Sequence, residues 1–340
     1  MNITEISKGI SHIEDLPIDT FISVLTNLHE YEITEKVDGA EILFGIDQNG
    51  FYTSREAKGG IRIYSAEDYS KTFSTTYMRS AHMLLEQALP SLKAAGLKRG
   101  DQVEAEVLYG ELPNVVPYSA DKSYLIFLRA TEGTVNIDHL KQKLDGRSVS
   151  VSLVAPFTDD GRTISFREEG NTWLFSRAPI LENKLPSNSL DSHIYKIRKI
   201  LTTVDVLTGQ SYGTILETPL NKTPSWIKGE WKAVKEHVRE RRAYIESIYS
   251  KHVADIKEIL LNHLVRNMRS GFGPLIEDGG WIEGVVLKHQ STGKMVKLVD
   301  KDVFGTVRQI AWEKRNYLTE HAKGVESHAG FMGRLLLDMA

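Results

Sequence analysis

The chain has no cysteine among its 340 residues. Disulfide bonds, thiol chemistry and cysteine-ligated zinc are therefore excluded. No segment approaches the roughly 18 consecutive apolar residues of a membrane-spanning helix, so no membrane partner is expected. Residues 1–8 do not join a basic segment to an apolar one, so no secretory signal is expected and a cytoplasmic location is the default.

An excess of positive charge is also missing. The formal net charge of −3 disfavours a protein that coats nucleic acid by general electrostatic attraction, although a local basic site for a nucleic-acid end stays compatible. The sequence has no Walker lysine loop, no Gly-x-Gly-x-x-Gly and no His-Glu-x-x-His. Phosphate binding by a P-loop or a Rossmann turn is therefore disfavoured.

What is present is typical of a globular protein that contains both helices and strands. Its length predicts two domains, or one domain with a large insertion. Helical patterns cover residues 15–30, 67–95, 136–145, 185–275, 301–320 and 331–339. Strand patterns cover residues 31–36, 41–46, 101–110, 124–130, 281–288 and 294–299, and a hairpin is expected near 159–161. These patterns predict an α+β fold in which residues 1–184 and 276–320 form one core, 185–275 form a helical accessory module, and 321–340 form a C-terminal helix.

The stretch Lys36-Val-Asp-Gly39 lies between the first two strand patterns. It predicts two strands joined by a tight glycine turn. A lysine at such a turn can lie half-buried in a cleft, where its deprotonated amine can act as a nucleophile. Taken alone, the stretch is better explained as an ordinary hairpin with a lysine at its edge.

Charged residues interrupt several strand patterns, and a charge on a buried strand needs a partner or a ligand. These residues are Glu35, Lys36, Asp38, Arg55, Glu106, Glu283, Lys288 and Lys297. The cations suit the phosphates of a nucleoside triphosphate, and the carboxylates suit a divalent metal. The sequence therefore predicts a site for a nucleotide and a metal.

The order of these segments resembles the covalent nucleotidyltransferase superfamily, which includes ATP-dependent DNA ligases, RNA ligases and mRNA capping enzymes. Lys36-x-Asp-Gly is similar to the first motif, Glu283-Gly-Val-Val-Leu-Lys288 matches the fourth in full, and Met295-Val-Lys297 is similar to the fifth. The pattern is closest to RNA ligases of the RNA ligase 2 type. The resemblance implies a nucleotidyltransferase (ATP-grasp-like ligase) core of antiparallel sheets flanked by helices. It covers residues 30–130 and 280–305, and 185–275 have no counterpart.

The resemblance also implies a role for each matching residue. Lys36 would attack the α-phosphate of ATP and form a lysyl–AMP, while Lys288 and Lys297 would hold that phosphate. The expected nucleotide-binding residues are Glu35 (adenine amino group), Asp38, Gly39, Arg55 (ribose and 5′-phosphate), Glu106 and Phe127 (stacked on adenine). Glu283 and Glu106 would help to place Mg²⁺ or Mn²⁺. Glu111 is the rival to Glu106, and Phe127 fits equally well as a plain core residue.

The implied activity is ATP-dependent joining of nucleic-acid ends, by transfer of AMP to a 5′-phosphate and attack of a 3′-hydroxyl. RNA is favoured over DNA, because few residues follow Lys297 and the C-terminal OB domain of DNA ligases is not expected within them. Three positions depart from the pattern: Glu41 replaces an arginine of DNA ligases, Leu128 an acid, and Val299 the second lysine of the fifth motif. A DNA ligase, a nucleotidyltransferase with a non-nucleic-acid acceptor and a nucleic-acid-binding protein that has lost ligation stay open as alternatives.

The helical segment 225–269 carries ten Lys or Arg and six Asp or Glu, a net charge of +4. A solvated helical hairpin is the simpler interpretation, and a nucleic-acid-facing module is the alternative. Candidate contacts to nucleic acid are Arg241 and Arg242 in this segment and Lys58 in a glycine-rich turn.

Overall fold

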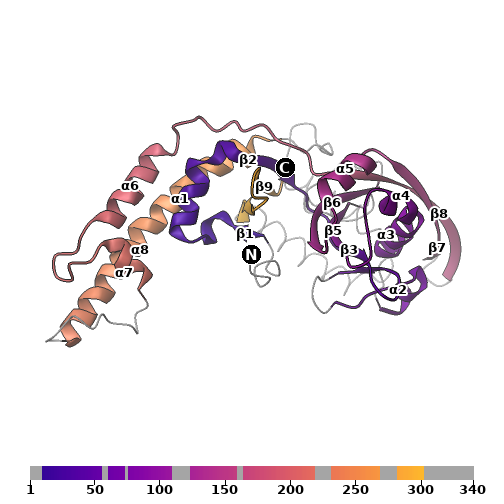
Figure 1. The fold of residues 1–340 in the computed structure, drawn as a ribbon, viewed down its shortest axis with the longest axis horizontal. Helices are drawn as coiled ribbons and strands as arrows, with labels where there is room; N and C mark the ends of the chain where they lie inside the picture. The colour runs from indigo at the N-terminus through magenta and orange to yellow at the C-terminus, as the bar shows by residue number, and fades with distance from the viewer. Residues whose placement is uncertain are drawn as a thin grey trace.

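The structure, a computed structural model, describes residues 10–55, 60–72, 76–108, 123–158, 164–218, 231–268 and 282–301. Two β-sheets flanked by helices make the protein α+β, as predicted. The molecule is elongated: the large sheet lies at one end, the small sheet in the middle, and a long helix extends to the other end (Figure 1). Within the described ranges, no helix is both long and apolar enough to cross a membrane.

The large sheet has six strands in the order β4-β3-β5-β6-β8-β7. They are β3 (Ala40–Ile46), β4 (Phe51–Ser54), β5 (Gln102–Leu108), β6 (Ser123–Glu132), β7 (Ser148–Thr158) and β8 (Ile164–Arg177). The β7–β8 pair is the hairpin expected near residues 159–161. β6 and β8 are parallel, which differs from the expected antiparallel sheet. The long connection through helix α5 (Ile137–Leu144) and β7 makes this parallel pairing possible.

The small sheet has four strands in the order β1-β10-β9-β2. They are β1 (Ser11–His12), β2 (Tyr31–Lys36), β9 (Gly284–His289) and β10 (Met295–Val299), and the β1–β10 pair is parallel. The outer edge of β2 is covered by the chain that leaves β8. The Glu35 N–H donates to the Pro179 carbonyl at 2.8 Å, and the Leu181 N–H donates to the Ile33 carbonyl at 2.8 Å.

One face of the large sheet packs against helices α3 (Thr76–Gln87), α4 (Leu89–Ala94) and α5, with α2 (Ala66–Thr72) beside α3. The helical pattern of residues 67–95 is divided among α2, α3 and α4, and Pro90 lies in the first turn of α4. Proline is tolerated there, since a first-turn N–H has no partner within the helix.

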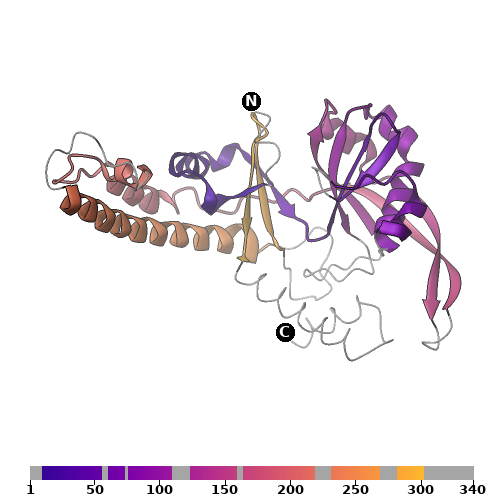
Figure 2. The same cartoon turned by 90° about the horizontal axis from the view of Figure 1, so that it is seen from below.

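The small sheet has a core of its own, built with helices α1 (Ile18–Thr26), α6 (Asp191–Thr202) and α8 (Trp231–Leu261). Ile194 of α6 and Leu260 of α8 belong to the same buried cluster as Ile33 and Val285 of the sheet. Short helical segments flank these elements: Ile13–Asp15, Leu28–Glu30, α7 (Tyr212–Glu217) and Asn262–Arg266. The segment predicted as an accessory module therefore shares its core with the small sheet, and Figure 2 shows that only its outer part projects away.

Residues 37–39 carry the chain from one sheet to the other. β2 pairs with β9, where Lys36 lies opposite Gly284, whereas β3 pairs with β4 and β5. The predicted hairpin is therefore wrong, because the local pattern specifies strands but not their partners. Gly39 is required for close packing: a Cβ there would lie 2.8 Å from the Cγ of Glu106 and 2.5 Å from the Val107 carbonyl oxygen.

Gly284 has a similar function beside Lys36, because a Cβ there would overlap the carbonyl oxygen of Leu298 on β10. We expect Gly284→Ala to lower the free energy of unfolding by roughly 1–3 kcal/mol, the usual cost of overpacking. Urea denaturation would measure it. Lys294→Ala, an exposed change in the same hairpin, is the control and should stay within about 0.5 kcal/mol of the parent. Equal stability of the two variants would contradict the prediction.

Candidate active site

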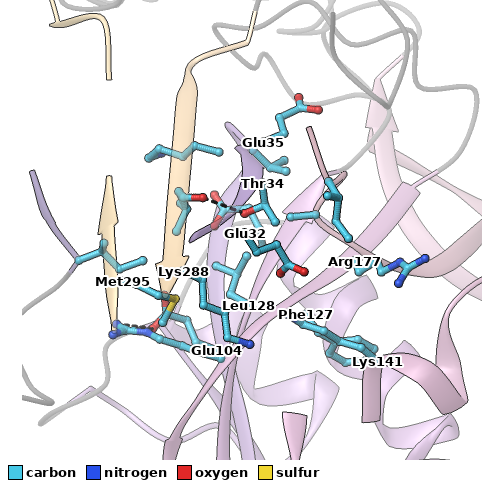
Figure 3. A pocket seen from close by; sticks show the side chains of 18 of the residues that line it. Glu32, Thr34, Glu35, Glu104, Phe127, Leu128, Lys141, Arg177, Lys288 and Met295 are labelled. Atoms are coloured by element: carbon cyan, nitrogen blue, oxygen red, sulfur yellow. Dashed lines mark hydrogen bonds and ion pairs between the residues drawn. The ribbon is translucent and has the colours of Figure 1, made fainter. Parts of the chain in front are cut away.

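A cavity of about 1070 Å³ is lined by residues of both sheets and of α5. This volume is at the upper end of the range of small-molecule sites. Figure 3 shows side chains of the small sheet, such as Lys288, opposite those of the large sheet, such as Glu104. The cavity is therefore bounded by elements that belong to two different hydrophobic cores.

The small sheet contributes three lysines to the cavity. Lys36 is the last residue of β2, Lys288 lies on β9 and Lys297 on β10, and all three line the cavity. Residues paired across a sheet share a face, and residues two apart along a strand do too. Val286 lies opposite both Thr34 and Lys297, which puts Lys36, Lys288 and Lys297 on one face, here called the lysine wall. The other face of this sheet enters the core.

The large sheet contributes carboxylates. Glu104 and Glu106 alternate along β5 with Val103, Ala105 and Val107, which are fully buried in the core. Both glutamates line the cavity. Glu104 Oε2 accepts a hydrogen bond from Arg129 Nε at 2.8 Å, and Arg129 Nη2 forms an ion pair with the same oxygen at 2.7 Å. Glu106 Oε1 accepts one from the Gly39 N–H at 3.0 Å.

Lys36 is held by a carboxylate that adjoins its own sheet. Its Nζ donates a hydrogen bond to Glu283 Oε2 and forms an ion pair with it. Glu283 directly precedes β9, and it is 8% exposed. The structure thus brings the predicted nucleophile together with a carboxylate that lies more than 240 residues away in sequence.

The environment of Glu106 raises the pKa of its carboxyl to about 8. Burial is the largest cause, and the nearby carboxylates of Asp38 and Glu283 raise it further. The ammonium of Lys36 and the hydrogen bond from Gly39 oppose this shift without cancelling it. At neutral pH the buried carboxyl is therefore mostly protonated, and a divalent cation placed beside it would favour its ionised form.

Two amines of the cavity, those of Lys297 and Lys141, lie close to other cations. Burial lowers the pKa of Lys297, and the charge of Lys36 lowers it further. Burial likewise lowers the pKa of Lys141 on α5, with a further contribution from Lys288. Lys288 Nζ is hydrogen-bonded to Asp138 at 3.2 Å. A polyanionic ligand would relieve this repulsion.

Other residues that were expected to bind the nucleotide lie in positions that are less suited to this role. Arg55 follows β4 directly and lines the cavity, and Asp38 is buried in the crossing segment. Glu35 borders the cavity, but as the strand neighbour of Lys36 it lies on the other face of β2, and it is 1% exposed. Phe127 is fully buried, and its ring stacks on Phe175 with centroids 5.4 Å apart. This packing fits the core interpretation of Phe127 better than a ring that stacks on adenine.

Residues that the sequence patterns did not single out also line the cavity. Asp138, Lys141 and Gln142 come from one face of α5, Arg129 comes from β6, and Arg177 is the last residue of β8. The spacing of the three α5 residues, i, i+3 and i+4, was the available signal for a shared face. It was missed because a short amphipathic helix is usually solvated on its polar face.

Several candidate site residues lie away from the cavity or outside the described ranges. Lys58 and Glu111 lie outside those ranges, as do residues 321–340, so the choice between Glu106 and Glu111 stays a prediction. Arg241 Nε donates to Asp205 Oδ2 at 3.1 Å. Arg242 Nε donates to Glu246 Oε1 at 2.8 Å. Both arginines belong to α8, and the outer part of this helix lies far from the large sheet (Figure 1).

No protein-family model, curated protein or solved structure matches this chain. The chemistry of the cavity must therefore be inferred from its own residues. A wall of amines faces a wall of carboxylates, and the amine of Lys36 is hydrogen-bonded to Glu283. Such a site can bind several phosphate groups together with a divalent cation, and it presents a candidate nucleophile to them.

Proposed function

We propose that this protein is a covalent nucleotidyltransferase of the polynucleotide ligase type, which uses ATP to join nucleic-acid ends. The observation that carries the proposal is the position of Lys36 between the lysine wall and the carboxylates of the large sheet. Its amine contacts Glu283, shares the lysine wall with Lys288 and Lys297, and lies near Glu106. The resemblance of the surrounding motifs to this superfamily supports the same assignment.

The residues present fit ATP and a divalent metal. The triphosphate would lie along the lysine wall, where its negative charge offsets the mutual repulsion of the amines. Mg²⁺ or Mn²⁺ would be held by Glu106 and Glu283, since these ions prefer carboxylate oxygens and Glu106 gains from an added cation. When bound, the metal supplies neutralisation of phosphate charge. RNA is the proposed strand, with DNA as the alternative.

In the first proposed step, Lys36 Nζ attacks the α-phosphorus of ATP. A phosphorus–nitrogen bond forms as the α–β phosphoanhydride bond breaks, and pyrophosphate leaves with the electron pair. Glu283 already accepts a hydrogen bond from Lys36, so its carboxylate is placed to take the amine proton. Lys288 and Lys297 would stabilise the charge that develops on the phosphoryl oxygens.

In the later steps, a 5′-phosphate oxygen displaces Lys36 from AMP, and a 3′-hydroxyl then displaces AMP from that phosphate. Arg55, exposed at the edge of the cavity, is placed to contact the incoming strand. Val299 lies in the same row across the sheet as Lys36, with Gly284 between them. A second lysine there would have extended the lysine wall, so its replacement by valine leaves less positive charge for strand binding.

A labelling experiment tests the proposal. The protein is incubated with Mg²⁺ and α-labelled ATP, with GTP in parallel, and we expect an ATP-specific label that survives denaturation and is released by acid. Adding 5′-phosphorylated nicked RNA should move the label to the strand and then yield sealed product, with nicked DNA as the comparison. A label that neither strand accepts would point to another acceptor. The absence of any label would contradict the proposed enzyme.

A further inference from the structure

A second group of chemically reactive side chains lies away from the cavity, where α6 packs against α8. It consists of His193 in the first turn of α6 and of His252 and Asp255 on α8. His252 and Asp255 are three residues apart, so they share a face of their helix. Both views show α6 alongside α8 (Figures 1 and 2).

The polar atoms of this group converge. One ligand atom from each residue lies within 4.8 Å of the other two. Nδ1 of His193 is 3.8 Å from Asp255 Oδ2, and Nδ1 of His252 is 3.9 Å from the same oxygen. These distances are too long for hydrogen bonds. The two imidazole rings meet edge to face, with centroids 5.5 Å apart.

The two Nδ1 atoms are buried, and neither has a hydrogen-bond partner among the described residues. A buried polar nitrogen without a partner costs about 1–3 kcal/mol, so two of them beside one carboxylate require an explanation. A cation between the three groups would satisfy both nitrogens and the carboxylate oxygen at once. An ion pair of protonated histidines with Asp255 is the competing explanation.

We propose that His193, His252 and Asp255 form a three-ligand site for a divalent transition metal, with Zn²⁺ as the best fit. Zn²⁺ binds histidine nitrogen and carboxylate oxygen at about 2.0–2.2 Å, which puts tetrahedral ligand atoms about 3.3 Å apart. The two nitrogen–oxygen separations exceed this by about half an ångström, and all three ligand atoms lie within 4.8 Å of one another, a gap that side-chain rotations can close. Imidazole ligands favour Zn²⁺, Co²⁺ or Ni²⁺ over Mg²⁺, so this site is chemically distinct from the proposed nucleotide site.

The fourth position of a tetrahedral ion would be open to water, because the Asp255 side chain is 43% exposed. The metal would join the first turn of α6 to the middle of α8, both of which pack against the small sheet. Its effect is therefore expected on the stability of these helices. It requires no nucleotide, so failure of this proposal and failure of the ligase proposal give separate results.

Metal content of the full-length protein tests the site. Chelator-treated protein is titrated with Zn²⁺ against a chromophoric chelator, and bound metal is counted after dialysis. We expect one Zn²⁺ at this site and an at least tenfold loss of affinity in His193→Ala and in His252→Ala. Asp255→Asn, which keeps the side-chain volume, should also weaken binding, and Zn²⁺ should raise the thermal midpoint of the parent but not of these variants.

His29→Ala is the matched control, since the His29 side chain is 76% exposed and lies outside the cluster. Its zinc affinity should equal that of the parent. The visible spectrum of a Co²⁺-loaded sample should show the strong bands of four-coordinate cobalt, and these should vanish in the folded Asp255→Asn variant. The proposal is overturned if the parent retains no Zn²⁺, or if His193→Ala and His252→Ala bind it as tightly as the parent.

Discussion

Replacing Lys36 with alanine is expected to abolish the acid-labile nucleotide label on the protein. Lys36 is the amine that forms the phosphorus–nitrogen bond in the proposed reaction, and its hydrogen bond to Glu283 holds it beside a proton acceptor. The rate of labelling should fall by at least about a thousandfold, as it does when a covalent nucleophile is removed. Autoradiography after denaturing electrophoresis measures this directly.

Lys36→Arg makes the test sharper. Arginine keeps the positive charge beside Glu283 but cannot lose its proton, so it cannot act as the nucleophile. We therefore expect Lys36→Arg to fold like the parent by circular dichroism and still to lose the label. Lys294→Ala, at the exposed turn between β9 and β10, should label normally. Retention of label by Lys36→Arg, or mass-spectrometric assignment of AMP to another residue, would contradict the proposal.

Glu106 should give the protein an unusual dependence of stability on pH. Its pKa is about 8 in the folded protein against an ordinary value of 4.5. Between these two values the folded state holds a proton that the unfolded state has released, so the free energy of unfolding falls as pH rises. The slope contributed by this one group is at most about 1.4 kcal/mol for each pH unit. Above pH 8 both states are ionised and the slope ends.

Urea denaturation at pH 5, 6, 7 and 8 in the absence of divalent metal checks this expectation. Glu106→Gln cannot ionise but keeps an oxygen for the Gly39 N–H, so its stability should decline less over this interval than that of the parent. The difference between the two proteins should therefore grow steadily in favour of the variant. Glu86→Gln, an exposed change on α3, should follow the parent. Parallel curves for Glu106→Gln and the parent would refute the shifted pKa.

The strand-borne parts of the site could be predicted because they depend on local alternation. The pattern of β5 places Glu104 and Glu106 on the face opposite Val103 and Ala105, and the structure confirms this. The β9–β10 hairpin was likewise predictable, since a Ser-Thr-Gly turn separates two apolar strands, and Gly293 has a φ of 67°. Both features need only the residues next to them in sequence.

The partners of the strands could not be predicted in the same way. The segment after Lys36 carries a glycine and a second strand, which locally favours a hairpin, yet β2 pairs with a strand some 250 residues later. Such a choice depends on which apolar faces are buried together, and this requires the whole chain. The packing of Phe127 against Phe175 and the position of Lys141 in the cavity also depend on how distant segments pack together.

The chain passes between the sheets at residues 37–39 and again near Pro179, and these two connections are neighbours because Glu35 is hydrogen-bonded to Pro179. Lys36 belongs to the small sheet and Glu106 to the large sheet, and each sheet has a hydrophobic core of its own. A rotation of one sheet about these connections would change the gap between the two side chains while leaving both interiors intact. The angle between the sheets is thus a variable of the site in its own right.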